Sequence, residues 1–182
     1  NSDVRCVVLT GAGEKAFCVG IDRDETMGDW GESDDVGERS ATTGEVGGNV
    51  WHFDDPGENI GPKTNDLWTP VIAAVKGMAC GGAYYMLGEV EFIIASENAT
   101  FFDPHVTYGM PAVYEPLLML HRGMPFGEIL RMTLLGNHER LSAERAREIG
   151  LVSEVCPSAD LDERAGWVAE AIASAPSGPM QA

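Results

Sequence analysis

Two stretches of the sequence run from an apolar strand directly into glycines, and they constrain the fold more than any other feature. The first, "VVLTGAGEKAFCVGID" (7–22), has glycines at three positions, and the second, "KGMACGGAYYML" (76–87), contains the pair Gly81 and Gly82. The run Val4–Thr10 is apolar almost throughout, which predicts a strand covered on both faces. Further strand-like runs alternate with segments of helical periodicity, so the sequence predicts an α/β fold.

The first glycine stretch also matches G-x-G-x-x-A, the pattern of a dinucleotide-binding turn. That turn requires a helix to begin on the glycines, so that its free N–H groups face the pyrophosphate. Here the next residues are "AFCVGID", in which Phe17, Val19 and Ile21 alternate as they do in a strand. No second apolar strand with an acidic ribose ligand occurs among residues 28–49. NAD binding is therefore a remote alternative.

The two glycine stretches share a layout that suits a different chemistry. In both, an apolar strand enters a loop in which glycine allows the backbone to approach a ligand closely. Gly81 and Gly82 stand where a helix is predicted to begin, so that unpaired N–H groups point outward. Two such loops that converge would present two N–H donors to one oxygen, which is an oxyanion hole for the enolate of a thioester.

Together with two later segments, these stretches resemble the enoyl-CoA hydratase/isomerase (crotonase) superfamily. The later segments are "FIIASENATFFDPHVTYGMP" (92–111) and "RMTLLGNHERLSAERAREIGLVSEVCP" (131–157), and all four follow the family's order. The resemblance implies one crotonase-like domain over residues 1–182, built as a spiral of β-β-α units with a mostly helical C-terminal part over 112–182. The family's usual first strand and helix, and its last helix, have no counterpart in this sequence.

The resemblance also implies roles for particular residues. The backbone N–H groups of Ile21 and Gly82 are the expected oxyanion donors. The residues expected to line the coenzyme A thioester are Val19, Ile21, Asp22, Gly81 and Gly82. The resemblance further implies an acyl-CoA substrate, no prosthetic group and no metal, and assembly as a homotrimer or a dimer of trimers.

The sequence departs from the family at the two glutamates of its hydratases, whose positions hold Tyr85 and His105 here. Tyrosine, with an ordinary pKa near 10, is a poor base at neutral pH, whereas histidine can act as acid or base. Asp103 and His105 would face the same side of a strand. We therefore expect His105 to be the general base, Asp103 to orient it and Tyr85 to donate to substrate. The alternative is that His105 and Asp103 only bond each other or local backbone. Glu115 is a secondary acid candidate, for which a surface or capping role is preferred.

These features predict an enzyme that stabilises an acyl-CoA enolate, nominally an enoyl-CoA hydratase or isomerase of fatty-acid or related acyl-CoA metabolism. One alternative is hydrolytic carbon–carbon cleavage or other non-hydratase chemistry that uses His105 and Asp103. A second alternative is a non-catalytic homologue that only binds acyl-CoA.

Composition excludes several partner classes. The formal net charge of −17 over 182 residues argues against nucleic-acid binding and against docking on anionic membranes. No apolar run approaches the roughly 20 residues of a membrane-spanning helix. The four cysteines form no C-x-x-C pair and no metal-site spacing, which favours reduced thiols in a cytoplasmic protein. Residues 22–66 are acidic and glycine-rich and are expected to form a long surface loop.

Overall fold

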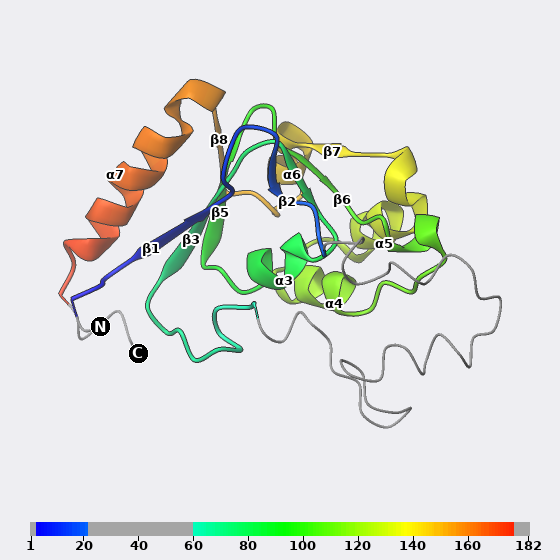
Figure 1. Cartoon of the computed structure of the whole chain (residues 1–182), viewed down its shortest axis with the longest axis horizontal. Coiled ribbons are helices and arrows are strands. Elements are labelled where there is room, and N and C mark those ends of the chain that lie inside the picture. Colours follow the sequence, from blue (N-terminus) through cyan, green and yellow to red (C-terminus); the bar gives the residue numbers. More distant parts are fainter. Residues whose placement is uncertain (1–2, 22–59, 177–182) are drawn as a thin grey trace.

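The computed structural model describes residues 3–21 and 60–176, which form two sheets and a set of helices (Figure 1). The first sheet has the parallel order β1 (Val7–Thr10), β3 (Val71–Val75), β5 (Phe92–Ser96) and β8 (Glu154–Cys156). The second has the order β2 (Ala16–Cys18), β4 (Met78–Cys80), β6 (Thr100–Phe102) and β7 (Leu141–Ser142), of which only β7 is antiparallel. Strands β1 to β6 alternate between the two sheets, β7 stays in the second sheet, and β8 returns to the first.

Helices of the described residues pack on the two sheets. The α-helices are α3 (Ala83–Leu87), α4 (Tyr114–His121), α5 (Phe126–Leu135), α6 (Ala143–Glu148) and α7 (Leu161–Ala173). Short 3-10 turns are η2 (His105–Tyr108), η3 (Gly136–His138) and η4 (Ser158–Asp160). The order β3, β4, α3 gives one of the β-β-α units that the resemblance implies.

The first sheet is the apolar scaffold of the molecule. Every residue of β3 is buried, as the β-branched run at 71–75 predicts for an inner strand. Helix α7 lies along β1, β3 and β5 (Figure 1), and Leu161 and Ala165 of this helix pack on Ala74 and Ile94. The main core lies between the two sheets and α3–α6 and includes Phe101, Tyr84 and Ile129.

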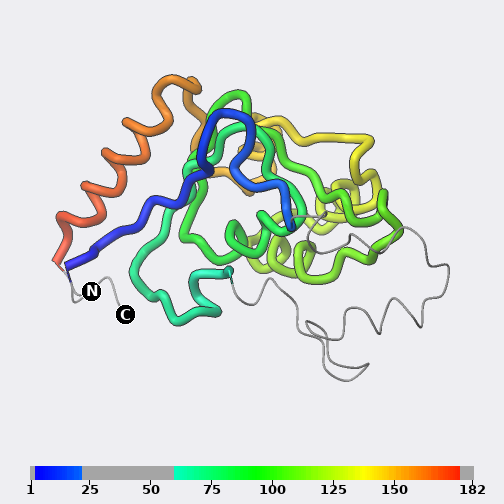
Figure 2. Tube along the Cα trace, viewed as in Figure 1, coloured from blue at the N-terminus to red at the C-terminus, as the bar shows by residue number. Residues whose placement is uncertain are grey.

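The expected burial of the first strand on both faces is wrong. Residues of β1 alternate between half-buried and exposed, and Val8 is 38% exposed. The physical reason is its position, because among the described residues β1 pairs only with β3 and forms the edge of its sheet. The start of this strand runs beside the end of α7 (Figure 2), where the Arg5 guanidinium donates a hydrogen bond to the Ala175 carbonyl.

Other local predictions are confirmed. The chain after Gly11 continues into β2 and not into a helix, which removes the structural basis for a dinucleotide turn. Ser142 caps α6 as predicted, since its hydroxyl accepts a hydrogen bond from the Arg145 N–H at 3.2 Å. No helix of the described ranges is long and apolar enough to cross a bilayer. The four cysteines are unpaired.

Candidate active site

The candidate site lies where three neighbouring strands of the second sheet end. Strands β2, β4 and β6 are parallel and adjacent, with Cys18 opposite Ala79 and Cys80 opposite Phe102. The loops that leave them therefore emerge at the same edge, where parallel sheets usually carry their ligands. The first two loops are the glycine bends of the sequence analysis, and the third begins with Asp103.

The two glycine bends meet, as predicted. Gly20 and Gly81 have φ angles of +93° and +54°, a backbone region in which only glycine is unstrained. A methyl group on Gly82 would lie 3.4 Å from the Gly20 Cα, and one on Gly20 would lie 3.6 Å from the Gly82 nitrogen. A methyl group on either glycine would thus reach ordinary van der Waals distance of the other bend, so the two backbones lie close together.

The neighbouring residues of the first bend are open to solvent. Val19 and Ile21 are both exposed, Ile21 to 44%, although each is apolar. An exposed apolar side chain beside a glycine bend is available for contact with a ligand. Asp22, which the sequence analysis places in the same group, lies outside the described residues.

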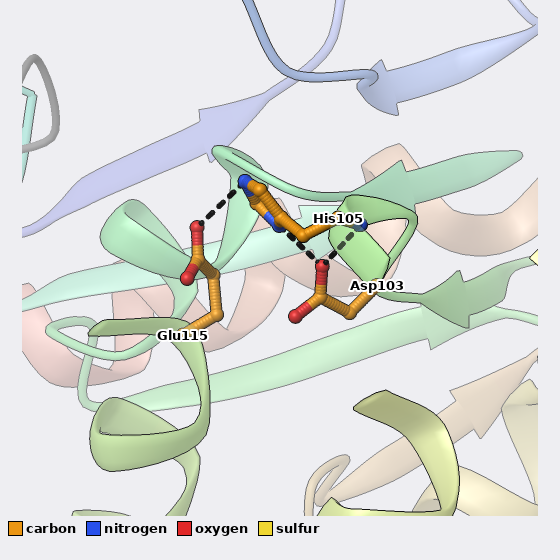
Figure 3. Close-up of side chains that lie close together, drawn as sticks. All are labelled: Asp103, His105 and Glu115. Carbon is orange, nitrogen blue, oxygen red and sulfur yellow. Dashed lines mark hydrogen bonds and ion pairs between the residues drawn. The ribbon is translucent and has the colours of Figure 1, made fainter. Parts of the chain in front are cut away.

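Asp103 and His105 are in direct contact. The imidazole Nδ1 lies 2.5 Å from Asp103 Oδ1, and the His105 backbone N–H donates to the same oxygen at 3.2 Å (Figure 3). Asp103 is 0% exposed, whereas the His105 side chain is 23% exposed. The aspartate therefore fixes the ring from inside, while the ring itself remains accessible.

The backbone that brings these two side chains together differs from the prediction. Strand β6 ends at Phe102, before Asp103, and His105 begins the 3-10 turn η2. Pro104 lies between them and cannot donate to a strand ladder, so the chain turns here instead of continuing extended. The expectation that both residues share one face of a strand is wrong, but their expected contact exists.

Glu115 joins this pair, contrary to the preferred surface interpretation. It lies in the first turn of α4 and is only 2% exposed. Its Oε1 lies 3.5 Å from His105 Nε2 (Figure 3), and this oxygen has no hydrogen-bond partner among the described residues. The contact is therefore a close approach and not a formed hydrogen bond.

Burial perturbs the ionisation of Glu115. Loss of solvent raises the pKa of its carboxyl, and the nearby Asp103 charge acts in the same direction. Hydrogen bonds from its own backbone N–H and from the Tyr85 side chain, together with the charge of His105, partly oppose that rise in pKa. Burial and the Asp103 charge thus favour the protonated form of this carboxyl.

Tyr85 lies on the site side of α3. A methyl group on Gly82 would be 3.9 Å from its Cδ2, and its ring lies 6.2 Å from that of Tyr114 at the start of α4. Tyr84, by contrast, is fully buried, with its hydroxyl directed at the Met132 sulfur at 3.1 Å. Of the two adjacent tyrosines, position 85 is the one near the glycine bends.

Asp103, His105 and Glu115 together resemble a metal-binding group, because one ligand atom from each lies within 4.8 Å of the others. Their arrangement favours hydrogen bonding instead. Two ligand atoms on one ion, each about 2 Å from it, are normally about 3 Å apart, whereas Nδ1 and Oδ1 are separated by 2.5 Å. The pair would have to open before an ion could take both atoms as ligands.

Comparison with known proteins identifies the family to which this chain belongs. A family model described as enoyl-CoA hydratase/isomerase matches residues 52–182. The chain belongs to the enoyl-CoA hydratase/isomerase family. Its fold is accordingly the crotonase fold, as the sequence predicts.

Two curated relatives and one solved structure illustrate the match within the family. The chain is 36% identical over its whole length to (E)-benzylidenesuccinyl-CoA hydratase of Thauera aromatica, and 34% identical over 95% of its length to mevalonyl-coenzyme A hydratase of Beauveria bassiana. An enoyl-CoA hydratase/isomerase from Mycobacterium paratuberculosis superposes over the whole chain with a TM-score of 0.77 and 34% identity. The chain spans 64%, 59% and 62% of these three proteins, respectively.

A separate hollow of about 560 Å³ lies beside α4, where Lys63 and Arg122 face Glu89 and Glu91. Its charges are already balanced, since Lys63 Nζ is 2.7 Å from Glu91 and Arg122 donates to the Val90 carbonyl. The hollow therefore offers no surplus of positive charge for the phosphates of a coenzyme A substrate such as the family uses.

Proposed function

We propose that this protein catalyses the reversible addition of water to the double bond of an enoyl-CoA thioester. The observation that carries the proposal is the contact between the Gly20 and Gly82 bends beside His105. Three of its supports are independent: the family, the meeting of the bends, and an accessible histidine held by a buried aspartate.

In the proposed mechanism, the N–H groups of Ile21 and Gly82 donate to the thioester oxygen. Negative charge develops on that oxygen when the β-carbon is attacked, so donors fixed in place beforehand lower the barrier. His105 accepts a proton from the attacking water, and Asp103 stabilises the resulting imidazolium and keeps its ring oriented. Tyr85 donates a hydrogen bond or a proton on the side of the α-carbon.

The proposed contacts with acyl-CoA follow from the residues that lie at the two glycine bends. Val19 and Ile21 supply exposed apolar surface at the first bend, and Gly81 and Gly82 allow the thioester to approach the backbone. Asp22 remains a prediction. The proposal requires no prosthetic group, and it places the protein in the cytoplasm, in agreement with four unpaired cysteines.

We further propose assembly as a homotrimer or a dimer of trimers. Helix α5 supports this, because Phe126, Leu130 and Leu134 are exposed at a spacing of four residues and form one apolar stripe. Such a stripe on a helix usually marks a contact with another chain. Sedimentation velocity tests the assembly, and a monomer at micromolar concentration would contradict it.

One observation also favours a second activity. The Asp103–His105 pair could activate water for attack on a ketone, which is the requirement for hydrolytic carbon–carbon cleavage. A cyclic diketone tests this activity directly, because hydrolysis opens its ring to a carboxylate.

The deciding experiment measures hydration of crotonyl-CoA by the loss of its enoyl thioester absorbance, with wild type, His105→Ala and His138→Ala. We expect His105→Ala to lower kcat by about 10²- to 10⁴-fold, the usual contribution of a general base. His138 is exposed on η3 and serves as the matched control, with wild-type kcat.

Two outcomes would overturn the proposal. In the first, wild type binds crotonyl-CoA by calorimetry but does not turn it over, which would indicate a binding protein or, if the diketone is cleaved, a hydrolase. In the second, His105→Ala retains full activity, which would remove the assigned base.

A further inference from the structure

A buried carboxylate stands next to the proposed base, and the mechanism above does not use it. The Glu115 side chain is 3% exposed and the His105 side chain 23%. A substrate can therefore reach the imidazole, but the carboxylate behind it is covered. Any role for Glu115 in turnover is exerted through its neighbours.

Both ring nitrogens of His105 face carboxylates, but the two contacts differ. Nδ1 lies at hydrogen-bonding distance, 2.5 Å, from Asp103, whereas Nε2 lies 3.5 Å from Glu115 Oε1. The first contact fixes the tautomer, since the Nδ1 proton is held by the aspartate. The second is loose enough for Nε2 to accept a proton from elsewhere and close enough for a small ring rotation to pass that proton to Glu115.

Glu115 also contacts the other proposed participant, because the Tyr85 side chain forms a hydrogen bond with its carboxylate. One carboxylate thus links the residue that takes a proton from water to the residue proposed to act on the α-carbon. The titratable groups that face Glu115 are His105, Asp103, Tyr84 and Tyr85.

Buried polar atoms without hydrogen-bond partners at the site support a role for Glu115 beyond stabilising the structure. Buried polar atoms in proteins are nearly always satisfied, and exceptions gather where chemistry requires them. Among the described residues, four buried side-chain atoms lack a hydrogen-bond partner, and two of them are Asp103 Oδ2 and Glu115 Oε1. A glutamate kept only for stability would be expected to use both oxygens.

We propose that Glu115 is the positioning residue that connects His105 to Tyr85 and carries a proton between them during turnover. This inference rests on the proposed hydration. Water loses one proton to His105 Nε2 as its oxygen bonds to the β-carbon. Tyr85 gives one proton to the α-carbon as the enolate collapses, and regains it from Glu115, which is reprotonated by His105. One water is consumed, both of its hydrogens are accounted for, and no electron is transferred.

The test compares Glu115→Gln and Glu115→Asp with Glu144→Gln, whose carboxylate is exposed on α6 and forms an ion pair with Arg147. Glutamine matches glutamate in shape but cannot carry a proton. We expect Glu115→Gln to lower kcat by about 10- to 100-fold, at the lower end of acid–base contributions, with the dissociation constant of crotonyl-CoA unchanged. Glu115→Asp should recover part of kcat, and Glu144→Gln should equal wild type.

Two pH measurements separate a relay from a structural role. The pH profile of kcat should change its shape in Glu115→Gln but not in Glu144→Gln. In the ligand-free protein, the NMR titration curve of the His105 ring should differ between wild type and Glu115→Gln but not between wild type and Glu144→Gln, because only Glu115 exchanges a proton beside Nε2.

The outcomes distinguish this inference from the proposed function. If wild type is active and His105→Ala is not, a folded Glu115→Gln with wild-type kcat and pH profile overturns the relay and leaves the hydratase proposal intact. If wild type hydrates no enoyl-CoA, the proposed function fails, and the relay fails with it. If Glu115→Gln does not fold, the same criteria apply to Glu115→Asp, whose shorter side chain should alter both kcat and its pH profile.

Discussion

Each sheet has a buried polar residue at the end of one strand, and the two residues differ in how fully their polar atoms form hydrogen bonds. Ser96 ends β5 in the first sheet and Asp103 follows β6 in the second, and both are 0% exposed. The Ser96 hydroxyl lies 2.5 Å from Asn98 Oδ1 and 3.3 Å from the Val75 carbonyl, so its hydrogen-bonding capacity is used. In the part of the chain that the structure describes, Asp103 Oδ2 and Glu115 Oε1 have no hydrogen-bond partner.

This difference separates scaffold from site. A satisfied buried hydroxyl contributes modestly to stability, whereas an unsatisfied carboxylate costs free energy that the rest of the fold must offset. Proteins usually violate local rules of this kind where function requires it. The buried end of β5 is thus satisfied, whereas the buried end of β6 carries a group that costs stability.

The largest expected effect comes from replacing these two buried polar groups one at a time. Asp103→Asn removes the charge that holds His105 Nδ1, and we expect kcat to fall by about 10²-fold or more. Ser96→Ala should lower the free energy of unfolding by about 1 kcal/mol, the typical value of one hydrogen bond, with kcat unchanged. Steady-state kinetics and urea unfolding of both variants check this. A large loss of kcat in Ser96→Ala, with the variant folded, would erase the distinction between the two sheets.

Substitutions at two glycines, Gly82 at the site and Gly77 in the scaffold, test the same comparison through the backbone. A methyl group on Gly82 would lie 3.4 Å from the Gly20 Cα, at ordinary van der Waals distance, so Gly82→Ala should fill the space between the two bends without distorting the fold. We expect kcat to fall by about 10- to 100-fold, less than the 10²- to 10³-fold cost of deleting an oxyanion donor, with little loss of stability.

Gly77, between β3 and β4, is the structural counterpart. A methyl group there would lie 2.2 Å from the Lys15 carbonyl oxygen, and its φ is +61°. Gly77→Ala should therefore destabilise the protein by about 2 kcal/mol or more, while the folded fraction keeps its kcat. Thermal unfolding and active-site-normalised kinetics distinguish the two glycines, and equal effects on stability would contradict the assignment.

Much of the fold was predictable because its signals are local. The apolar run at 71–75, the glycines at 81 and 82, and the Ser142 cap each determine their own element through propensity and hydrogen bonding. The contact between the two glycine bends was predictable only through the family resemblance, since residues 20 and 82 are far apart in the chain.

Two of the predictions that were wrong concern burial, which depends on neighbours in the tertiary structure. An edge strand and an inner strand have similar apolar sequences, so the exposure of Val8 cannot be read from residues 4–10. Glu115 stands between Tyr114 and Pro116 at the start of a helix, a setting typical of exposed acids. It is buried because α4 packs against α3 and carries Glu115 to His105, a contact that no local pattern encodes.

The smallest expected effect concerns stability as a function of pH. Burial raises the pKa of Glu115 above its ordinary value of 4.5, so between the two values the folded state binds more protons than the unfolded state. Stability contributed by this group is therefore present at low pH and is lost as pH rises through that window. Glu115→Gln cannot ionise, so its free energy of unfolding should match wild type near pH 4 and exceed it increasingly toward pH 7.

Urea unfolding at several pH values measures this difference, with Glu144→Gln as a control that should show no trend. The opposite slope, with Glu115→Gln becoming less stable than wild type as pH rises, would mean that ionised Glu115 stabilises the fold through His105. In that case the unsatisfied carboxylate would belong with Ser96, among the groups that hold the structure together. The expected slope instead identifies a group that the fold keeps at a cost in stability, as a residue retained for its proton should be.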